Sequence, residues 1–318
     1  MSIILIHLPP NDLPKQTLEH IRALAPHHTV VVTDQREEVE QILGSVEVAA
    51  VHFSPQWIMR APRLRWYQQW GAGTDWLLRH PEVASLDFTL TNASGVHAIP
   101  ISEHILAMML AFTRQLPAAF RAQAQGKWQR DLPAFELAGS TMVLVGVGAI
   151  GRRTAKIASA LGMHVIGIRR NPSQSLPEVH RMVGPDRLVD VLPEADFIVL
   201  TLPLTNDTRH LLDARAFEKM KSSAYVINIG RGGTIDEEAL IQALQTGAIA
   251  GAGLDVFSNE PLPADSPLWE MDNVIITAHY SGTTPHYNDR ALEIFIDNLD
   301  RYLKGQPLRN VVDKRLGY

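Results

Sequence analysis

The feature that most constrains the fold of this chain is a glycine motif at residues 146–151, which reads Gly-Val-Gly-Ala-Ile-Gly. A short apolar run at residues 142–145 precedes the motif and is typical of a buried parallel strand. Apolar residues at helical spacing follow it as far as Gly162, and a second apolar run at residues 164–168 predicts another strand. The segment therefore predicts a β-α-β unit.

Each glycine of the motif has a physical role in binding a dinucleotide. Gly146 permits the tight turn, Gly148 lets the backbone approach a pyrophosphate, and Gly151 lets the helix pack on the strand. The free N–H groups at the start of the helix attract the anion. A structural turn is the alternative reading, but the flanking strand and helix favour a dinucleotide site.

Two arginines, Arg169 and Arg170, stand at the end of the second strand. About twenty residues past the motif, NAD-binding proteins normally carry an acidic residue for the ribose 2′-hydroxyl. A guanidinium group instead binds a 2′-phosphate through charge-assisted hydrogen bonds, although both arginines could simply be solvated surface residues. We expect NADP(H) as the cofactor, with NAD(H) less favoured.

Composition excludes several classes of protein. The 318 residues, of which 46% are hydrophobic and 20% charged, suit a soluble chain of two domains. A net charge of −5 without a basic block argues against nucleic acid or an anionic membrane as a partner. The absence of cysteine excludes disulfides and thiolate metal sites, and we predict no metal. The N-terminus lacks a signal-peptide pattern, so we expect a cytoplasmic protein.

Apolar runs typical of strands alternate with helical patterns along the chain, which predicts an α/β fold with parallel sheets covered on both faces. Strands are expected at 3–8, 30–32, 46–53, 64–70, 88–91, 197–202, 224–229, 249–256 and 274–277. Helices are expected at 15–24, 98–113, 213–220, 236–245 and 285–303. We expect two doubly wound domains: a Rossmann cofactor domain (98–284) and a flavodoxin-like substrate domain (1–97 with 285–318).

Three residues with catalytic chemistry follow predicted strands of the cofactor domain: Arg231, Glu260 and His279. The carboxyl ends of parallel strands meet at one crevice, so we expect these side chains to converge. An arginine can hold a 2-oxo acid by its carboxylate and polarise its carbonyl. A histidine can give a proton to a carbonyl that becomes an alcohol, and a neighbouring carboxylate fixes its tautomer and favours its protonated form.

Each of these residues also has a structural interpretation when it is taken alone. Arg231 could be a surface ion-pair partner, Glu260 a solvated loop residue, and His279 a satisfied histidine at a strand end. The hypothesis of a catalytic site depends on the three residues occurring together.

Together with further segments, this set resembles the D-isomer-specific 2-hydroxyacid dehydrogenases. The segments are residues 71–75 (Gly-Ala-Gly-Thr-Asp), the turn 202–205 with Thr208, residues 253–256, and Glu260-Pro261. The resemblance implies an NAD(P)-dependent oxidoreductase with two doubly wound domains and the active site between them. It also implies a homodimer, with the helix 98–113 as hinge and dimer contact, and a small 2-oxo acid as substrate. Glyoxylate or hydroxypyruvate is the leading expectation, and a larger branched or aromatic 2-oxo acid follows closely.

By resemblance, Arg231 binds the substrate carboxylate and carbonyl oxygen, His279 is the acid/base, and Glu260 orients it. The backbone N–H groups of Ala72 and Gly73 are implied to bind the carboxylate, and Asp255 to lie near the nicotinamide carboxamide. The implied cofactor-binding residues are Gly146, Gly148, Ala149, Ile150, Gly151, Arg169, Arg170, Leu202, Pro203, Thr208, Ile229, Gly230, Asp255, Ser281 and Gly282.

Two positions depart from the family's usual pattern: Ala278 replaces the Pro before the histidine, and Tyr280 follows where a small aliphatic residue is common. We expect these changes to tune the pocket without loss of chemistry. Two alternatives stay open, a phosphoglycerate dehydrogenase-like enzyme and a non-enzymatic NAD(P)-sensing protein similar to the corepressors that share this fold.

Overall fold

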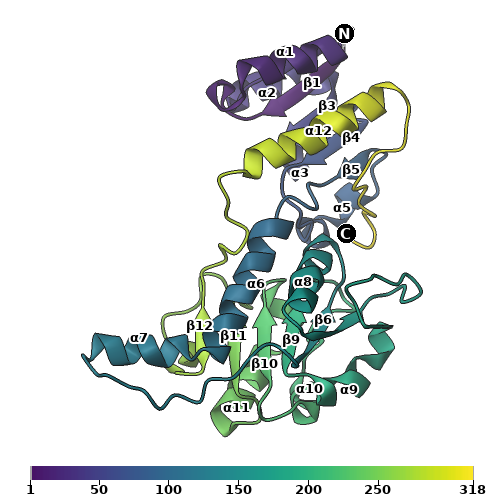
Figure 1. Ribbon diagram of the computed structural model, residues 1–318. Coiled ribbons are helices and arrows are strands. Elements are labelled where there is room, and N and C mark those ends of the chain that lie inside the picture. The colour runs from purple at the N-terminus through teal and green to yellow at the C-terminus, as the bar shows by residue number, and fades with distance from the viewer. Residues whose placement is uncertain (1, 318) are drawn as a thin grey trace. The chain divides into compact units, whose positions relative to one another are not determined.

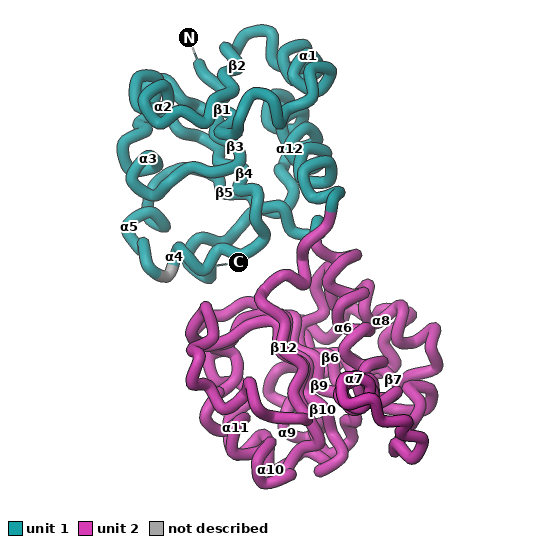
Figure 2. Tube along the Cα trace, turned by 90° about the vertical axis from the view of Figure 1, so that its left-hand side faces the viewer, with its two compact units in different colours: residues 1–96, 285–318 teal, residues 97–284 magenta. Residues whose placement is uncertain are grey.

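The computed structural model describes residues 2–317, apart from the side chain of Leu78, and divides them into two compact units. Unit 1 comprises Met1–Val96 and Pro285–Tyr318, and unit 2 comprises His97–Thr284 (Figure 2). The sequence-based boundary fell one residue later, after His97. The ring of His97 packs against the backbone of Gly282 in unit 2, 3.0 Å from the position that a Cβ there would take.

Unit 1 contains a parallel sheet with the strand order β2-β1-β3-β4-β5, which is the flavodoxin-like order (Figure 2; β1, β3, β4 and β5 are also labelled in Figure 1). Helices α1 and α12 cover one face of the sheet, and α2, α3 and α5 cover the other. The strands are β1 (Ile3–His7), β2 (Thr29–Val32), β3 (Val46–Val51), β4 (Trp66–Gln69) and β5 (Thr89–Thr91). The helices are α1 (Lys15–Leu24), α2 (Arg36–Ile42), α3 (Pro55–Arg60), α4 (Trp76–Arg79), α5 (Pro81–Ala84) and α12 (Tyr287–Leu303).

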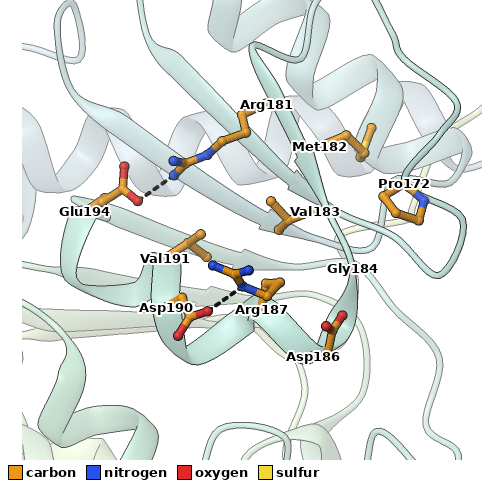
Figure 3. Close-up of a pocket in the computed structure, with 10 residues that line it drawn as sticks. All are labelled: Pro172, Arg181, Met182, Val183, Gly184, Asp186, Arg187, Asp190, Val191 and Glu194. Atoms are coloured by element: carbon orange, nitrogen blue, oxygen red, sulfur yellow. Dashed lines mark hydrogen bonds and ion pairs between the residues drawn. The ribbon is translucent and has the colours of Figure 1, made fainter.

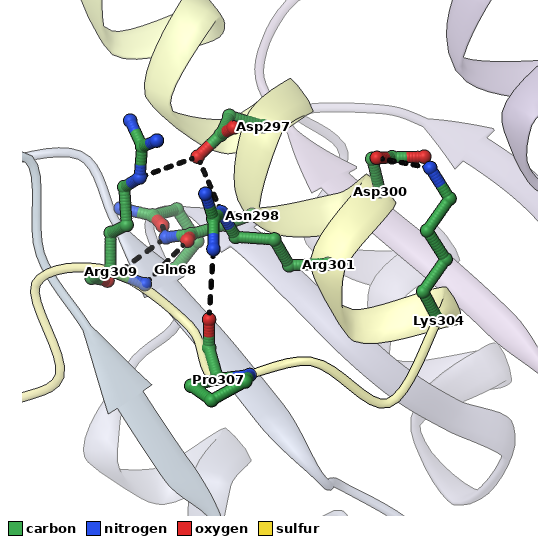
Figure 4. Close-up of polar contacts among 8 residues, drawn as sticks. All are labelled: Gln68, Asp297, Asn298, Asp300, Arg301, Lys304, Pro307 and Arg309. Atoms are coloured by element: carbon green, nitrogen blue, oxygen red, sulfur yellow. Dashed lines mark hydrogen bonds and ion pairs between the residues drawn. The ribbon is translucent and has the colours of Figure 1, made fainter.

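A buried polar network ties the C-terminal segment to the sheet of unit 1 (Figure 4). The side-chain oxygen of Gln68 in β4 accepts hydrogen bonds from Thr91 Oγ1 at 2.7 Å and Asn298 Nδ2 at 3.1 Å. Asn298 in α12 also exchanges two hydrogen bonds with the backbone of Arg309, at 3.1 and 2.8 Å. Because buried polar groups need partners, this network fixes α12 on the sheet that the first 96 residues form.

Unit 2 contains a parallel sheet with the order β12-β11-β10-β9-β6-β7-β8, the Rossmann order extended by one strand. Helices α6 and α8 cover one face, and α9, α10 and α11 cover the other. The strands are β6 (Thr141–Val145), β7 (His164–Ile168), β8 (Arg181–Val183), β9 (Phe197–Leu200), β10 (Tyr225–Asn228), β11 (Gly251–Leu254) and β12 (Val274–Ile276). The helices are α6 (Ala98–Thr113), α7 (Leu116–Ala124), α8 (Ala149–Ala160), α9 (Leu188–Val191), α10 (Ala214–Lys219) and α11 (Glu237–Thr246). Within residues 2–317, the helices include none that is long and apolar enough to span a bilayer.

These two α/β domains with parallel sheets confirm the predicted fold class. The sequence analysis gave no range for β8, for α7 or for the short helices α2, α3, α4, α5 and α9. β8 is an edge strand of only three residues that begins with the exposed Arg181, which is too short to show a strand pattern. α7 leaves Phe120 62% exposed and buries only Ala122, so no buried stripe marks it.

Candidate functional site

The glycine motif forms a tight turn from β6 into α8. Gly146 has φ +99°, and a Cβ there would lie 3.1 Å from the backbone nitrogen of Leu202. A Cβ on Gly151 would overlap the carbonyl oxygen of Gly146, which also accepts a hydrogen bond from Thr201 Oγ1 at 2.5 Å. Packing alone therefore requires glycine at two of the three positions.

Gly148 differs from the other two glycines because nothing in the protein fills the space beside it. Gly148 is exposed and is the N-cap residue of α8. A Cβ at this position would meet no atom within 4 Å. Ala149 and Ile150 follow it in the first turn of this 12-residue helix. An open backbone at a helix N-terminus fits a pyrophosphate, which binds through N–H groups and the helix dipole.

Arg169 and Arg170 come directly after the strand that flanks this turn. Ile168, the last residue of β7, accepts the Gly146 N–H at 3.1 Å. Arg169 is half-buried and its N–H donates to Val183 O at 3.1 Å, while Arg170 is exposed. Arg169 therefore directly follows Ile168, which is hydrogen-bonded to the glycine turn, so the two arginines begin next to that turn.

A hollow of about 470 Å³ lies beside β8 and α9 in unit 2 (Figure 3). Arg181 pairs with Glu194 and Arg187 pairs with Asp190, so the cationic side chains drawn there already face carboxylates. The lining includes none of the predicted site residues. We therefore do not assign the cofactor to this hollow.

The turn after β10 holds Arg231 through a small polar network. Asn228, which is buried, accepts the Gly230 N–H at 3.0 Å and donates from Nδ2 to Arg231 O at 3.1 Å. The hydroxyl of Thr234 donates to the same Arg231 carbonyl oxygen at 2.6 Å. Arg231 Nη1 donates to Gly230 O at 2.7 Å. The sequence analysis missed the roles of Asn228 and Thr234, which only their contacts reveal.

Close packing presses this turn against both neighbouring turns. A Cβ on Gly232 would overlap the carbonyl group of Phe257, which follows β11, and a Cβ on Gly230 would lie 2.7 Å from Leu202 O, which follows β9. The turn after β9 is closed by two hydrogen bonds of the Thr208 hydroxyl group. This group donates to the carbonyl oxygen of Pro203 at 2.7 Å and accepts the N–H of Thr205 at 2.7 Å. The structure thus brings Leu202, Gly230 and the Arg231 backbone together, with the buried Ile229 linking strand and turn.

His279 and Glu260 form a direct pair at the end of the sheet. Nδ1 of His279 lies 2.7 Å from Oε2 of Glu260, and the side chains are 49% and 35% exposed. The other carboxylate oxygen, Oε1, accepts the Phe257 N–H at 3.0 Å. His279 has φ +51°, and its own N–H donates to Asp255 O at 2.9 Å. The carboxylate is therefore held on one side by backbone and on the other by the imidazole.

Asp255 is fully buried and organises the loop that carries His279. Its carboxylate accepts hydrogen bonds from Thr277 Oγ1 at 2.6 Å and from the N–H groups of Tyr280 and Ser281, both at 3.1 Å. The sequence analysis placed this residue at the nicotinamide, and that contact stays a prediction. Its support of the histidine loop is a structural role that spacing alone does not show.

Two further histidines of unit 2 adjoin this loop. His104 Nε2 lies 3.0 Å from Thr277 Oγ1, and the His104 ring meets the Tyr280 ring edge-on at 5.6 Å. Burial lowers the pKa of His104, against the opposing effect of Asp255. Burial also lowers the pKa of His97, and Arg231 adds to that shift. Their lowered pKa values favour neutral imidazoles next to the loop at Ser281 and Gly282.

Ala72 and Gly73 belong to unit 1, in the loop after β4. Gln69 Nε2 donates to Gly71 O at 3.1 Å and Gly73 O at 2.5 Å, and Asn92 Nδ2 donates to Ala72 O at 2.8 Å. Amide side chains thus hold the carbonyl groups of the loop. Carboxylate binding by its N–H groups stays a prediction.

A profile of the NAD-binding domain of D-isomer-specific 2-hydroxyacid dehydrogenases matches residues 106–281, which is more than half of the chain. The chain belongs to this family. It is therefore an NAD(P)-dependent oxidoreductase, as the sequence analysis predicted.

Three similar dehydrogenases and reductases illustrate the range of relatives. A glyoxylate/hydroxypyruvate reductase B from Enterobacter sp. strain 638 is 32% identical and aligns over 98% of both chains. A D-3-phosphoglycerate dehydrogenase from Methanocaldococcus jannaschii is 36% identical over 70% of this chain, which spans only 43% of that relative. A crystal structure of an NADPH-dependent glyoxylate/hydroxypyruvate reductase from Sinorhizobium meliloti, in complex with NADP and sulfate, has a TM-score of 0.84 at 30% identity and covers 100% of both chains.

Proposed function

We propose that this dehydrogenase reduces a small 2-oxo acid, glyoxylate or hydroxypyruvate, to the D-2-hydroxy acid with NADPH as the preferred reductant. The observation that carries the proposal is the 2.7 Å pair of His279 and Glu260 on a loop that Asp255 anchors. The names of the Enterobacter and Sinorhizobium meliloti relatives support the same substrates.

His279 is the proton donor in this proposal. Glu260 holds Nδ1–H, which leaves Nε2–H of the imidazolium for the carbonyl oxygen of the substrate. Arg231 binds the substrate carboxylate and stabilises the negative charge that develops on the carbonyl oxygen. The N–H groups of Ala72 and Gly73 bind the same carboxylate. The nicotinamide, when bound, supplies the hydride.

The proposed cofactor contacts follow the edge of the unit 2 sheet. The open backbone at Gly148 and the start of α8 would hold the pyrophosphate. The implied contacts at Leu202, Pro203, Thr208, Ile229, Gly230, Asp255, Ser281 and Gly282 would continue the site along that edge. Arg169, with Arg170, would bind the 2′-phosphate of NADP(H), since guanidinium groups form bidentate hydrogen bonds with phosphate.

A phosphoglycerate dehydrogenase activity is the second candidate. The Methanocaldococcus jannaschii relative supports it with the higher identity of 36%, over the part of that protein that this chain spans. The two candidates differ in whether the preferred substrate carries a phosphate group.

We also propose that the chain is a homodimer, as its resemblance to the family implies. Large apolar side chains at and after α6 stay exposed in the single chain, with Leu110 at 41%, Phe120 at 62% and Trp128 at 92%. Exposed apolar area of this kind is typical of an interaction surface. The expected location in the cytoplasm stays a prediction.

Absorbance at the nicotinamide band tests the proposed reaction directly. Purified protein is mixed with NADPH or NADH and with glyoxylate, hydroxypyruvate, 2-oxoisocaproate, phenylpyruvate or phosphohydroxypyruvate. Oxidation of NADPH by one of the first two acids, abolished in His279→Ala, is the expected result. Preference for phosphohydroxypyruvate would favour the second candidate. Cofactor binding without turnover of any acid would favour an NAD(P)-sensing protein.

A further inference from the structure

The turn after β3 in unit 1 contains a strained residue next to an exposed histidine. Val51 ends β3 with φ +82°, and His52 follows it on the surface. A β-branched residue with positive φ is a rare outlier, because its side chain crowds the backbone. Such strain persists only where the surroundings enforce it, and it concentrates at functional sites.

Tyr67 enforces this conformation from both sides of His52. Its hydroxyl group donates to Val51 O at 3.3 Å and accepts the Phe53 N–H at 3.2 Å. Tyr67 is buried, so both hydrogen bonds form away from solvent. The backbone on either side of His52 is therefore fixed, which presents its imidazole on a rigid support.

A second imidazole, from His7 at the end of β1, lies next to His52. The ring centroids are 5.9 Å apart, and the His7 ring also meets Trp57 edge-on at 5.1 Å. Nδ1 of His7 is buried and has no hydrogen-bond partner among residues 2–317. Burial, followed by His52, lowers the pKa of His7 against the opposing effects of the His52 backbone and of Asp34, which favours a neutral ring. A buried nitrogen without a hydrogen-bond partner destabilises the fold.

The two imidazoles stand at the strand ends where ligands bind in such sheets. β1 has β2 on one side and β3 on the other, so the strand order reverses between β1 and β3. His7, Val51 and Gln69 form one row across β1, β3 and β4. Gln69 holds the Gly71 and Gly73 carbonyl groups of the proposed carboxylate-binding loop. β3 is the direct neighbour of β4, the strand that leads into this loop, and neighbouring strands lie about 4.8 Å apart.

We propose that His52, supported by His7, binds an oxygen on the third carbon of the substrate, so that the preferred substrate is a 3-hydroxy-2-oxo acid. This inference rests on the proposed function, because the loop at Ala72 and Gly73 must bind the carboxylate. A 3-hydroxyl oxygen lies three bonds, and at most about 4 Å through space, from the carboxylate carbon, a reach comparable to one strand spacing. Each ring nitrogen of an imidazole can form one hydrogen bond, and a hydroxyl group can either donate or accept that bond.

The test compares hydroxypyruvate with pyruvate, which lacks only the hydroxyl group. We expect the wild-type protein to show a kcat/KM for hydroxypyruvate at least about 10-fold higher than for pyruvate. His52→Leu should lower this ratio by about 10-fold or more, whereas His52→Gln, which keeps a donor and an acceptor, should stay within about 3-fold of wild type. His20→Leu, an exposed histidine of α1, is the matched control and should not change the ratio.

His7→Phe extends the test with a readout on folding. Phenylalanine keeps the ring against Trp57 and removes the unpartnered nitrogen, so the melting temperature should rise or stay unchanged while the ratio falls. A ratio that His52→Leu leaves unchanged, in a protein that reduces both acids, would overturn this inference alone. Absence of turnover with every 2-oxo acid would instead overturn the proposed function and this inference with it.

Discussion

Nδ1 of His279 lies 2.7 Å from Oε2 of Glu260, and the other oxygen of the same carboxylate accepts the Phe257 N–H at 3.0 Å. The carboxylate is therefore oriented before any substrate arrives. In the proposed mechanism, this carboxylate fixes the histidine tautomer and leaves Nε2 for the substrate, as a general acid requires.

Glu260→Gln should lower kcat for the best 2-oxo acid by about 10- to 100-fold, because the imidazolium loses its negative partner. Stopped-flow absorbance at the nicotinamide band would measure the reduction step. His279→Gln should cost about 10²- to 10⁴-fold. The double variant should be little worse than His279→Gln alone, since the carboxylate acts through the histidine. Additive losses would contradict a shared role.

Arg231→Lys should lower kcat/KM by about 10²-fold or more, because an ammonium group cannot make the bidentate contact of a guanidinium. The asparagine and threonine that hold the Arg231 backbone are unchanged in this variant, so the loss should reflect side-chain chemistry. Arg215→Lys, at an exposed position of α10, is the control and should keep full activity. Retention of wild-type kcat/KM in Arg231→Lys would remove this residue from the substrate site.

Arg169→Asp should reverse the cofactor preference, because a carboxylate repels a 2′-phosphate and can accept a hydrogen bond from a ribose 2′-hydroxyl. We expect the ratio of kcat/KM for NADPH over NADH to fall by about 10- to 100-fold. Lys156→Asp makes the same change in charge at an exposed site on α8 and should leave the ratio nearly unaltered. An equal response in both variants would indicate a general electrostatic effect.

Two glycine substitutions should separate folding from cofactor binding. Gly232→Ala would place a Cβ on the Phe257 carbonyl group and should destabilise the protein by about 3 kcal/mol or more. Gly148→Ala meets no protein atom within 4 Å, so its melting temperature should match wild type while its affinity for NADPH falls. Thermal unfolding and fluorescence titration with NADPH measure the two effects. Unchanged NADPH affinity in Gly148→Ala would contradict the assigned pyrophosphate site.

Stability should fall as the pH drops below 6.5. Burial lowers the pKa of His7, His97 and His104 from the usual value of 6.5. Below pH 6.5 these histidines become protonated in the unfolded chain, whereas in the folded chain they become protonated only at lower pH. The unfolded chain therefore binds more protons in this range, and acid favours unfolding. The melting temperature should be a few degrees lower at pH 5.5 than at pH 7.5. His7→Phe should reduce this difference, and a higher melting temperature at pH 5.5 would contradict the assignment.

Local patterns were sufficient to predict much of the fold. The bounds predicted for α1, α6 and β7 match the structure, because each segment has a strong apolar pattern and clear ends. The predicted strands at residues 46–53 and 249–256 extended beyond β3 and β11, because apolar residues continue past the paired segment. β8 escaped prediction because an edge strand of three residues, only two of them apolar, is too short to show a pattern.

The sequence by itself determined which residues the proposed chemistry uses: the glycine turn, the arginines after β7, and the ordered set of Arg231, Glu260 and His279. Each of these depends on residue type and local spacing, which the chain encodes directly. Only the tertiary structure decided what supports them, because such contacts join residues far apart in sequence. Asp255 anchors the loop of His279, and Tyr67 constrains the turn at His52, through hydrogen bonds that no local pattern specifies.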